Sequence, residues 1–299
     1  MRPVLHIGQR ENRSHGDERF PFAAYVHQCP PGANPIDCHW HEESELLLIQ
    51  SGAMLMQIGT TYVPLKAGEA VFVHSGDIHA GYPLGDSGCS FFAAVFHFNL
   101  LRSRTLDIIQ TAYIAPLLVG ERSLPERYTP DTGWGGEALA HIRRIRDAAL
   151  LRRPGYELAV KAHLLGLLAE LAAEERWVER APSKMAETSR MDGLKAVLQY
   201  ISDNYKSKIR IIDLAAIIYM SEGHFCRFFK AITRQTPVAY MNAFRLRAAA
   251  ELLANTDGKI VDIALECGFD NLSYFSRKFR EHAGMTPAAY RRKLRAGLR

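Results

Sequence analysis

The spacing of apolar residues changes along the chain. Between residues 20 and 100, short apolar runs such as "ELLLIQ", "AMLMQI" and "AVFV" are separated by turns that contain glycine, serine or aspartate. This pattern predicts the strands of an antiparallel sandwich or small barrel. From about residue 135, apolar residues recur at helical spacing, and Pro154-Gly155 separates two helical segments. We therefore expect a barrel over about 20–100 and helices over about 135–178.

A polar stretch follows these helices. The sequence "RAPSKMAETSRM" contains proline and few apolar residues, which favours a linker over residues 181–191. From residue 192 onward the apolar spacing is helical again. The expected fold is therefore α+β with two domains, a barrel with appended helices over 1–180 and an all-α domain over 192–299.

The C-terminal third contains a repeat. Asp213 and Ala215 recur 49 positions later as Asp262 and Ala264, and after one extra residue the offset becomes 50. Matches in register over such a length indicate a duplicated structural unit. The matches at the second offset are Phe225, Arg227, Phe229, Thr236, Pro237, Ala239 and Tyr240 with Phe275, Arg277, Phe279, Thr286, Pro287, Ala289 and Tyr290.

Each copy predicts a short helix, a tight turn and a second helix. Ser221 and Asn271 are the expected N-caps of the two second helices. The apolar residues of these helices form stripes that we expect to be buried, namely Phe225, Phe228, Phe229 and Ile232 in the first and Phe275 and Phe279 in the second. The polar residues off the stripes are His224, Arg227 and Lys230 in the first and Ser273, Ser276, Arg277 and Arg280 in the second. This is the pattern of a helix-turn-helix, whose second helix enters the major groove of DNA.

The charge of the chain is divided unevenly. Residues 192–299 hold 18 Lys and Arg against 10 Asp and Glu, so their net charge is +8, whereas residues 1–191 hold 19 against 22, a net −3. A basic third favours a nucleic-acid partner. The alternative is a solvated basic surface on ordinary packed helices, and the duplication together with the outward polar faces favours DNA binding.

The composition of the chain indicates the cellular compartment in which the protein works. The five cysteines are scattered without a CxxC pair, which predicts free thiols in a reducing compartment. No run of eighteen apolar residues is present, and the charged N-terminal stretch lacks the apolar core of a secretory signal. We expect a cytoplasmic protein with no membrane partner.

The stretch "CHWHEESE" raises a question of chemistry. His39, His41 and Glu45 share one face if the strand is continuous, and His79 would join them from a neighbouring strand. Three imidazoles and a carboxylate suit Zn, Fe, Mn, Ni or Cu. The same groups would also line a metal-free pocket for a small polar ligand. Catalysis is a further and less favoured alternative, because the sequence pattern identifies no second carboxylate or other acid/base partner for these four residues.

Two aromatic residues near these histidines are candidate members of an effector pocket. Trp40 and Tyr82 would stack on a sugar or an aromatic effector. The alternative for both is ordinary packing.

Residues 193–295 resemble the DNA-binding domain of AraC/XylS-type bacterial transcription regulators. The stretches "DLAAIIYMSEGHFCRFFK", "TPVAYMNAFRLRAAAELL" and "IVDIALECGFDNLSYFSRKFREHAGMTPAAYR" carry the resemblance. It implies that Gly223, Cys226 and Arg227 face the bases in the first unit, with His224 and Lys230 on phosphates, and that Leu272, Ser273, Ser276 and Arg277 face the bases in the second. Gly223 and Cys226 depart from the family in being small.

The N-terminal region resembles the cupin-like sensing barrel of such regulators. "HWHEESELLLIQSG" fits the motif H-x-H-x3-E-x6-G, and "GEAVFVHSGDIH" fits the second motif approximately. Two departures are His74 where proline is usual and Pro83 where asparagine is common.

The resemblance implies a regulator rather than an enzyme. Its barrel would sense a small molecule, a sugar being one candidate, and would dimerise together with the helices over 135–178. No cofactor is required by this interpretation, and the partners it implies are promoter DNA, a second copy of the chain and, for an activator, RNA polymerase. The alternative is a metal-dependent cupin enzyme, such as a dioxygenase or isomerase, that carries a DNA-binding module.

Overall fold

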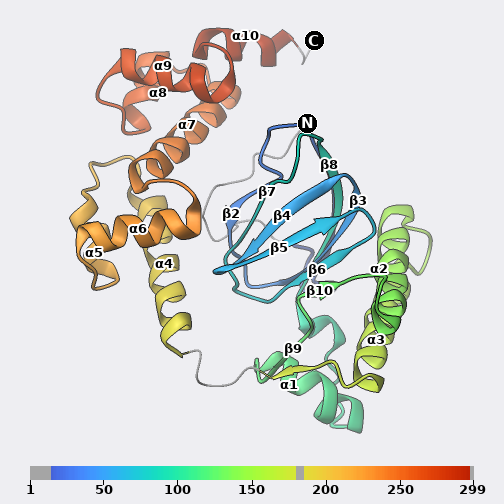
Figure 1. Ribbon diagram of the computed structural model, residues 1–299. Helices are drawn as coiled ribbons and strands as arrows, with labels where there is room; N and C mark the ends of the chain where they lie inside the picture. The colour runs from blue at the N-terminus through green and yellow to red at the C-terminus, as the bar shows by residue number, and fades with distance from the viewer. Residues whose placement is uncertain (1–14, 180–184, 297–299) are drawn as a thin grey trace. The chain divides into compact units, whose positions relative to one another are not determined.

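The computed structural model describes residues 15–179 and 185–296. The chain divides into two compact units, an N-terminal one that ends at Thr188 and a C-terminal one that begins at Ser189 (Figure 1). The first unit is built from strands with helices appended, and the second is helical. The expected α+β class, a cupin-like β domain followed by an all-α domain, is confirmed.

Two antiparallel sheets form the barrel of the N-terminal unit. The larger has the strand order β1-β8-β3-β6-β10 and the smaller β2-β7-β4-β5, and the expected runs "ELLLIQ", "AMLMQI" and "AVFV" are strands. The larger sheet consists of β1 (Phe22–Cys29), β3 (Ser44–Ser51), β6 (Ala70–Val73), β8 (Cys89–Phe96) and β10 (Arg127–Tyr128). The smaller consists of β2 (Ile36–His39), β4 (Ala53–Ile58), β5 (Thr61–Lys66) and β7 (His79–Pro83).

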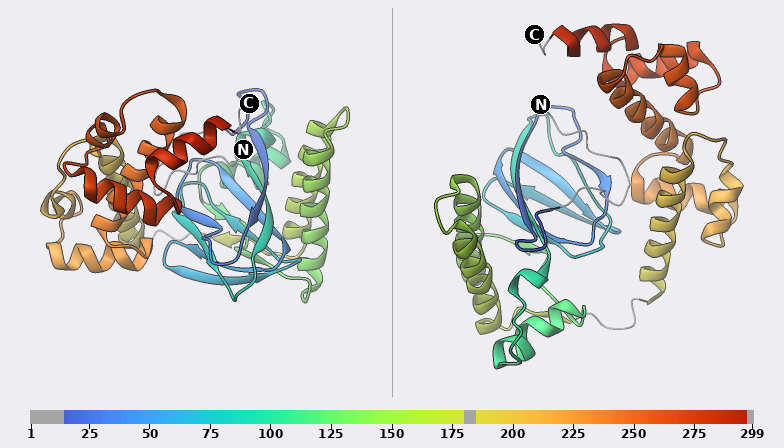
Figure 2. Two further views of the ribbon diagram at one scale, coloured as in Figure 1. Left: turned by 90° about the horizontal axis from the view of Figure 1, so that it is seen from above. Right: turned by 180° about the vertical axis from the view of Figure 1, so that it is seen from behind.

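Side-chain alternation gives the larger sheet two apolar faces. On β3, Leu47 and Ile49 point between the sheets and pack with Met54 and Met56 of the smaller sheet. The intervening Leu46 and Leu48 point the other way, where they join the core formed with α2 (Gly133–Leu151) and α3 (Tyr156–Ala173). Both views in Figure 2 show these two helices side by side along one flank of the sheets. A continuous apolar run such as "LLLI" therefore belongs to a strand buried on both faces.

Short elements connect the sheets to the helices. The 3-10 helix η1 (Phe98–Leu101) follows β8, and a π-helical turn η2 (Gln110–Ile114) continues into α1 (Ala115–Leu118). The two-residue strands β9 (Arg122–Ser123) and β11 (Val178–Glu179) pair with each other. None of these elements was expected from the sequence.

The C-terminal unit consists of helices. They are α4 (Met185–Asn204), α5 (Ile211–Ile217), α6 (Glu222–Thr233), α7 (Pro237–Asn255), α8 (Ile260–Glu266), α9 (Leu272–Ala283) and α10 (Pro287–Ala296). Because α4 begins at Met185, most of the expected 181–191 linker is helical, and residues 180–184 lie outside the described part of the chain. No helix in the described residues is long and apolar enough to cross a bilayer.

The repeat in the sequence is a repeat in the structure. The pairs α5–α6 and α8–α9 are the two helix-turn-helix units, and α7 connects them (Figure 1). The ring centroids of Phe229 and Tyr240 are 5.2 Å apart, and those of Phe279 and Tyr290 are 5.4 Å apart. Both copies therefore contain the same aromatic contact. Phe228 is only half-buried, which corrects its expected place in the fully buried stripe.

Candidate functional site

The second helix of each unit presents polar residues to solvent. Each of the ten residues expected to contact DNA lies on α6 or α9, and none of them is buried. Cys226 and Ser276 are half-buried, whereas the others are exposed. The exposed members are Gly223, His224, Arg227 and Lys230 on α6 and Leu272, Ser273, Arg277 and Arg280 on α9.

The two helices begin at the expected N-caps. Asn271 accepts a hydrogen bond through Oδ1 from the backbone N–H of Tyr274 at 2.8 Å, which satisfies one of the free N–H groups of the first turn. Ser221 occupies the N-cap position of α6 but its side chain makes no capping hydrogen bond. The second unit therefore has the more firmly capped helix.

A tyrosine orients one of the arginines. The guanidinium of Arg277 lies over the ring of Tyr274, and the Tyr274 hydroxyl accepts a hydrogen bond from Nδ2 of Asn242 on α7 at 3.0 Å. Tyr274 and Asn242 were missed by sequence reasoning. The signal that could have found Tyr274 is its place three residues before Arg277 on one helix face.

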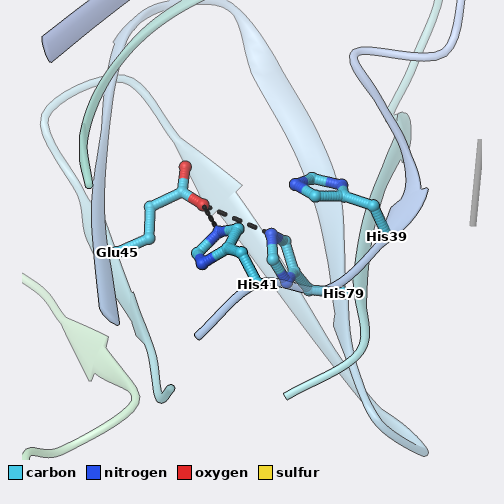
Figure 3. A group of neighbouring side chains, drawn as sticks. All are labelled: His39, His41, Glu45 and His79. Carbon is cyan, nitrogen blue, oxygen red and sulfur yellow. Dashed lines mark hydrogen bonds and ion pairs between the residues drawn. The ribbon is translucent and has the colours of Figure 1, made fainter. Parts of the chain in front are cut away.

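In the barrel the structure brings His39, His41, Glu45 and His79 together (Figure 3). All four are buried, and one potential ligand atom from each lies within 4.8 Å of the others. Oε2 of Glu45 is 3.4 Å from Nε2 of His41 and 3.2 Å from Nε2 of His79. The rings of His39 and His79 are 4.1 Å apart, between centroids.

Main-chain carbonyls fix the orientation of the three imidazoles. Nδ1 of His39 is 2.8 Å from the carbonyl oxygen of Asp37, and Nδ1 of His79 is 2.9 Å from that of Asp77. His41 makes the same contact with the carbonyl of Glu43 at 2.9 Å. A carbonyl oxygen can only accept, so each Nδ1 carries the proton and donates it. In the neutral imidazoles each Nε2 then presents a lone pair, as in metal-ligating histidines.

The carboxylate is the negative member of this cluster. Burial raises the pKa of Glu45, but where His41 and His79 are protonated, their Nε2–H hydrogen bonds and positive charge outweigh burial and hold that pKa well below its usual range. A carboxylate oxygen facing imidazole lone pairs is repelled, so the arrangement calls for positive charge, supplied by protons on the imidazoles or by a cation. The chemistry of the donor set thus fits a divalent transition metal.

His39, His41 and Glu45 do not lie on one continuous strand, which was the condition for their sharing a face by alternation. The strand β2 ends at His39 in the smaller sheet, and β3, which carries Glu45, lies in the larger sheet. His41 lies on the segment that crosses between them, and His79 is the register partner of His39 on β7. The cluster is therefore formed where the chain passes from one sheet to the other.

Tyr82 lies away from this cluster. It pairs in register with Leu55 of β4, on the face opposite to Met54, Met56 and the barrel interior. Its hydroxyl donates to Oε1 of the buried Gln57, which alternation places on the same face of β4 as Leu55. The expected place of Tyr82 in an internal effector pocket is therefore corrected, because strand alternation turns it outward.

Two other aromatic residues lie near the cluster. The ring of buried His15 is 5.4 Å from that of His41, and Nδ1 of His15 is 3.1 Å from the Tyr25 hydroxyl. Sequence reasoning missed both, since neither lies within a motif. Trp40, which follows His39, is half-buried at the end of β2.

A barrel joined to two helix-turn-helix units defines the class as a DNA-binding transcription regulator with a ligand-binding domain. The family model "Helix-turn-helix domain" matches residues 214–293, and the model "Cupin domain" matches residues 25–95. The chain belongs to the AraC/XylS-type transcription regulators with an N-terminal cupin domain.

Known proteins of this kind resemble the chain. It is 25% identical to the "Uncharacterized HTH-type transcriptional regulator YdeC" of Bacillus subtilis over 97% of this chain and 98% of that one. It is 33% identical to the "MmsAB operon regulatory protein" of Pseudomonas aeruginosa, over 36% of this chain and 34% of that one. Among solved structures, an AraC-type transcriptional regulator from Chromobacterium violaceum is 28% identical with a TM-score of 0.34, covering 36% of this chain and 96% of that one.

Proposed function

We propose that this regulator binds a divalent transition metal in its cupin barrel, at His39, His41, Glu45 and His79, and reads promoter DNA through α6 and α9. The observation that carries the metal proposal is that one potential ligand atom from each of these four buried residues lies within 4.8 Å of the others, with the three imidazole rings oriented by main-chain carbonyls. Nitrogen-rich sets of this kind suit Zn, Fe, Mn, Ni and Cu. When bound, such a metal would supply open positions for the oxygen atoms of a small effector.

The protein's own residues would prepare this site. The carbonyls hold the imidazole rings, and the ionised Glu45 offsets part of the metal charge. His15, packed beside His41, would border the space left for a small effector. That the full-length relative is named a transcriptional regulator supports sensing rather than turnover in the barrel.

We infer that DNA recognition rests on exposed cations of the two second helices. Arg227 and Lys230 on α6 and Arg277 and Arg280 on α9 are exposed and lie on the faces opposite the buried phenylalanines. Arginine can contact a guanine edge in a bidentate manner, and lysine binds phosphate. Bacterial promoter DNA lies in the cytoplasm, so we infer a cytoplasmic location. If the protein is an activator, we also infer contact with RNA polymerase.

A second copy of the chain is the partner that we infer for α3. On this helix Leu158, Ala162, Leu165, Ala169 and Ala172 follow one another at alternating spacings of four and three residues. Leu158, Ala162 and Ala169 are exposed, whereas Leu165 packs against the core of its own unit. Leu158 is 74% exposed. Such spacing is that of a coiled-coil seam, which supports homodimerisation through the helices after the barrel.

Metal analysis of the purified full-length protein tests the barrel proposal. We expect about one equivalent of metal per chain after loading and desalting, and loss of that metal in His41→Ala. His224→Ala on α6 is the matched control, because it removes an imidazole outside the barrel and should keep the metal. Equal metal content in all three proteins, or none in the unmodified chain, would overturn the proposal.

Gel shift against the promoter regions adjoining the gene, with a salt series, tests the DNA interface. Affinity should fall steeply with salt, because cations that contact phosphates release counterions. Lys230→Ala should weaken binding to all sequences alike, whereas Arg277→Ala should reduce discrimination at one base pair and cost about 1–3 kcal/mol. Binding that does not change with salt contradicts this interface.

A further inference from the structure

Two cysteines stand directly opposite each other in the larger sheet. Cys29 is the last residue of β1, Cys89 is the first of β8, and the two are register partners in an antiparallel pair. Opposed residues in such a pair have Cα atoms about 4.5–5.5 Å apart. A disulfide needs a Cα separation of about 4.4–6.8 Å, so the backbone is already placed for one.

The side chains of this pair point the same way. Cys89 belongs to the apolar cluster between the two sheets, and Cys29 packs against that cluster. Burial, together with the charge and the hydrogen bond of the Cys29 thiol, raises the pKa of Cys89 to about 11. The two thiols therefore share one face of the strand pair at opposed positions, and neither is in a disulfide in this structure.

One side of the pair is open to small reagents. Cys29 is half-buried, and β1 is the edge strand of the sheet. The turn residues that follow Cys29, at 30–32, and those at 83–87 before Cys89 are exposed. Cys38 is buried in β2, and Cys267 is buried just after α8. Cys29 is thus placed to meet a small oxidant while Cys89 is held behind it.

We propose that Cys29 and Cys89 form a reversible intramolecular disulfide when the protein meets a peroxide. The sulfur of Cys29 attacks the peroxide, the O–O bond breaks, and Cys29 becomes a sulfenic acid with release of one water from hydrogen peroxide. The sulfur of Cys89 then displaces the hydroxyl, which leaves as a second water, and the S–S bond forms. The two thiols lose two electrons and two protons, and the peroxide is reduced to two waters. A dithiol restores both thiols.

The disulfide would bind the edge strand to its neighbour covalently. The inner face of β1 also carries Tyr25, whose hydroxyl meets His15 beside the histidine cluster. Oxidation would therefore limit opening of β1 on the wall that the ligand site shares. Formation of the bond is independent of the proposed function, and only its effect on promoter affinity rests on it.

Oxidation of the full-length protein tests the pair. After stoichiometric hydrogen peroxide under native conditions, the titratable thiols should fall from five to three, and non-reducing peptide mapping should give one linked peptide that joins Cys29 to Cys89. The linked peptide should disappear after dithiothreitol. Cys226→Ser is the matched control and should still form the bond, whereas Cys29→Ser and Cys89→Ser should not.

The outcomes separate cleanly. Sulfinic acid at Cys29, a bond to another cysteine or between chains, or five remaining thiols would each overturn the pair. Cys29→Ser changes only a half-buried side chain, so it remains informative if Cys89→Ser fails to fold. Promoter affinity measured in the oxidised and reduced states should differ in the unmodified protein and not in Cys29→Ser. Equal promoter affinity in the two states would overturn the regulatory effect. Whether the disulfide forms is decided separately, by the peptide map.

Discussion

The guanidinium carbon of Arg277 lies 5.5 Å from the centre of the Tyr274 ring, and Tyr274 is itself hydrogen-bonded to Asn242 of α7. The side chain most suited to reading a base on α9 is therefore oriented from the helix that joins the two units. A cation over an aromatic face is worth about 0.5–1 kcal/mol at an exposed site. The second unit thus presents a partly pre-ordered arginine.

Tyr274→Leu should weaken specific promoter binding by up to about 1 kcal/mol, because Arg277 loses the ring that orients it. Competition gel shifts with specific and random DNA would measure this. Lys278→Ala is the control: Lys278 is half-buried and pairs with Glu281 at 2.7 Å, and its loss should leave the specificity ratio unchanged. If Tyr274→Leu folds and discriminates as well as the unmodified protein, the ring has no positioning role.

Glu45→Gln should lower metal affinity by at least about tenfold, because the carboxylate both ligates and neutralises charge. Asp37→Ala and Asp77→Ala are matched controls on the same segments. These aspartates serve the histidines through main-chain carbonyls, so their side chains are dispensable for metal binding. Competition with a chelator of known affinity measures all three. Comparable losses in the aspartate variants would contradict the carbonyl-held geometry.

The cupin domain should become less stable as the pH falls below neutral. His141 and His163 face each other between α2 and α3, with ring centroids 5.7 Å apart. Burial lowers the pKa of both histidines, and the positive charge of Arg144 lowers both further. His163 also lowers the pKa of His141, whereas Glu170 and Glu137 raise it.

The sign of this effect follows from proton uptake. Below the unfolded value of 6.5 the unfolded chain binds protons that the folded domain excludes, so the free energy of unfolding declines from about pH 7 downward. Urea unfolding at pH 7.5 and pH 5.5 would measure the decline. In His163→Gln the free energy of unfolding should fall less between pH 7.5 and pH 5.5. An equal fall in the variant and the unmodified protein would mean that other groups cause it.

The two turns of the duplicated unit should respond in opposite ways to substitution. Tyr219 has φ +54° and is 98% exposed, and at the matching position Gly268 has φ +80°. Tyr219→Gly relieves a left-handed backbone without loss of packing, so we expect stability to rise by up to about 1 kcal/mol.

Gly268→Ala should instead destabilise the C-terminal unit by about 2 kcal/mol or more. A Cβ there would lie 2.6 Å from the carbonyl oxygen of Tyr205. Thermal unfolding of the two variants beside the unmodified chain measures both effects. A similar loss of stability in Tyr219→Gly and Gly268→Ala would mean that the Tyr219 side chain stabilises the folded unit although it is exposed.

Local periodicity was enough to predict the strands, the paired helices and the duplication. The repeat fixed the outward faces of α6 and α9, because a 3.6-residue period leaves little freedom once Phe225 and Phe275 are buried. The histidine quartet was also foreseen as a set. Its assembly was not, since the alternation argument holds only for a continuous strand over residues 39–45 and the chain in fact changes sheets there. Tyr82 was misplaced because its inner or outer face depends on register with β4. Contacts such as Asn242 with Tyr274 join residues far apart in sequence, and no local pattern marks them.

The connecting helix α7 has a further consequence. Its 19 residues rise about 28 Å as one unbroken rod, and each added residue would turn one end by about 100° relative to the other. A change in the length of α7 would therefore change both the distance and the angle between α6 and α9. A promoter with one base pair more or less between its two contacted segments would not match both second helices at once. The length of α7 therefore sets the spacing of the binding site.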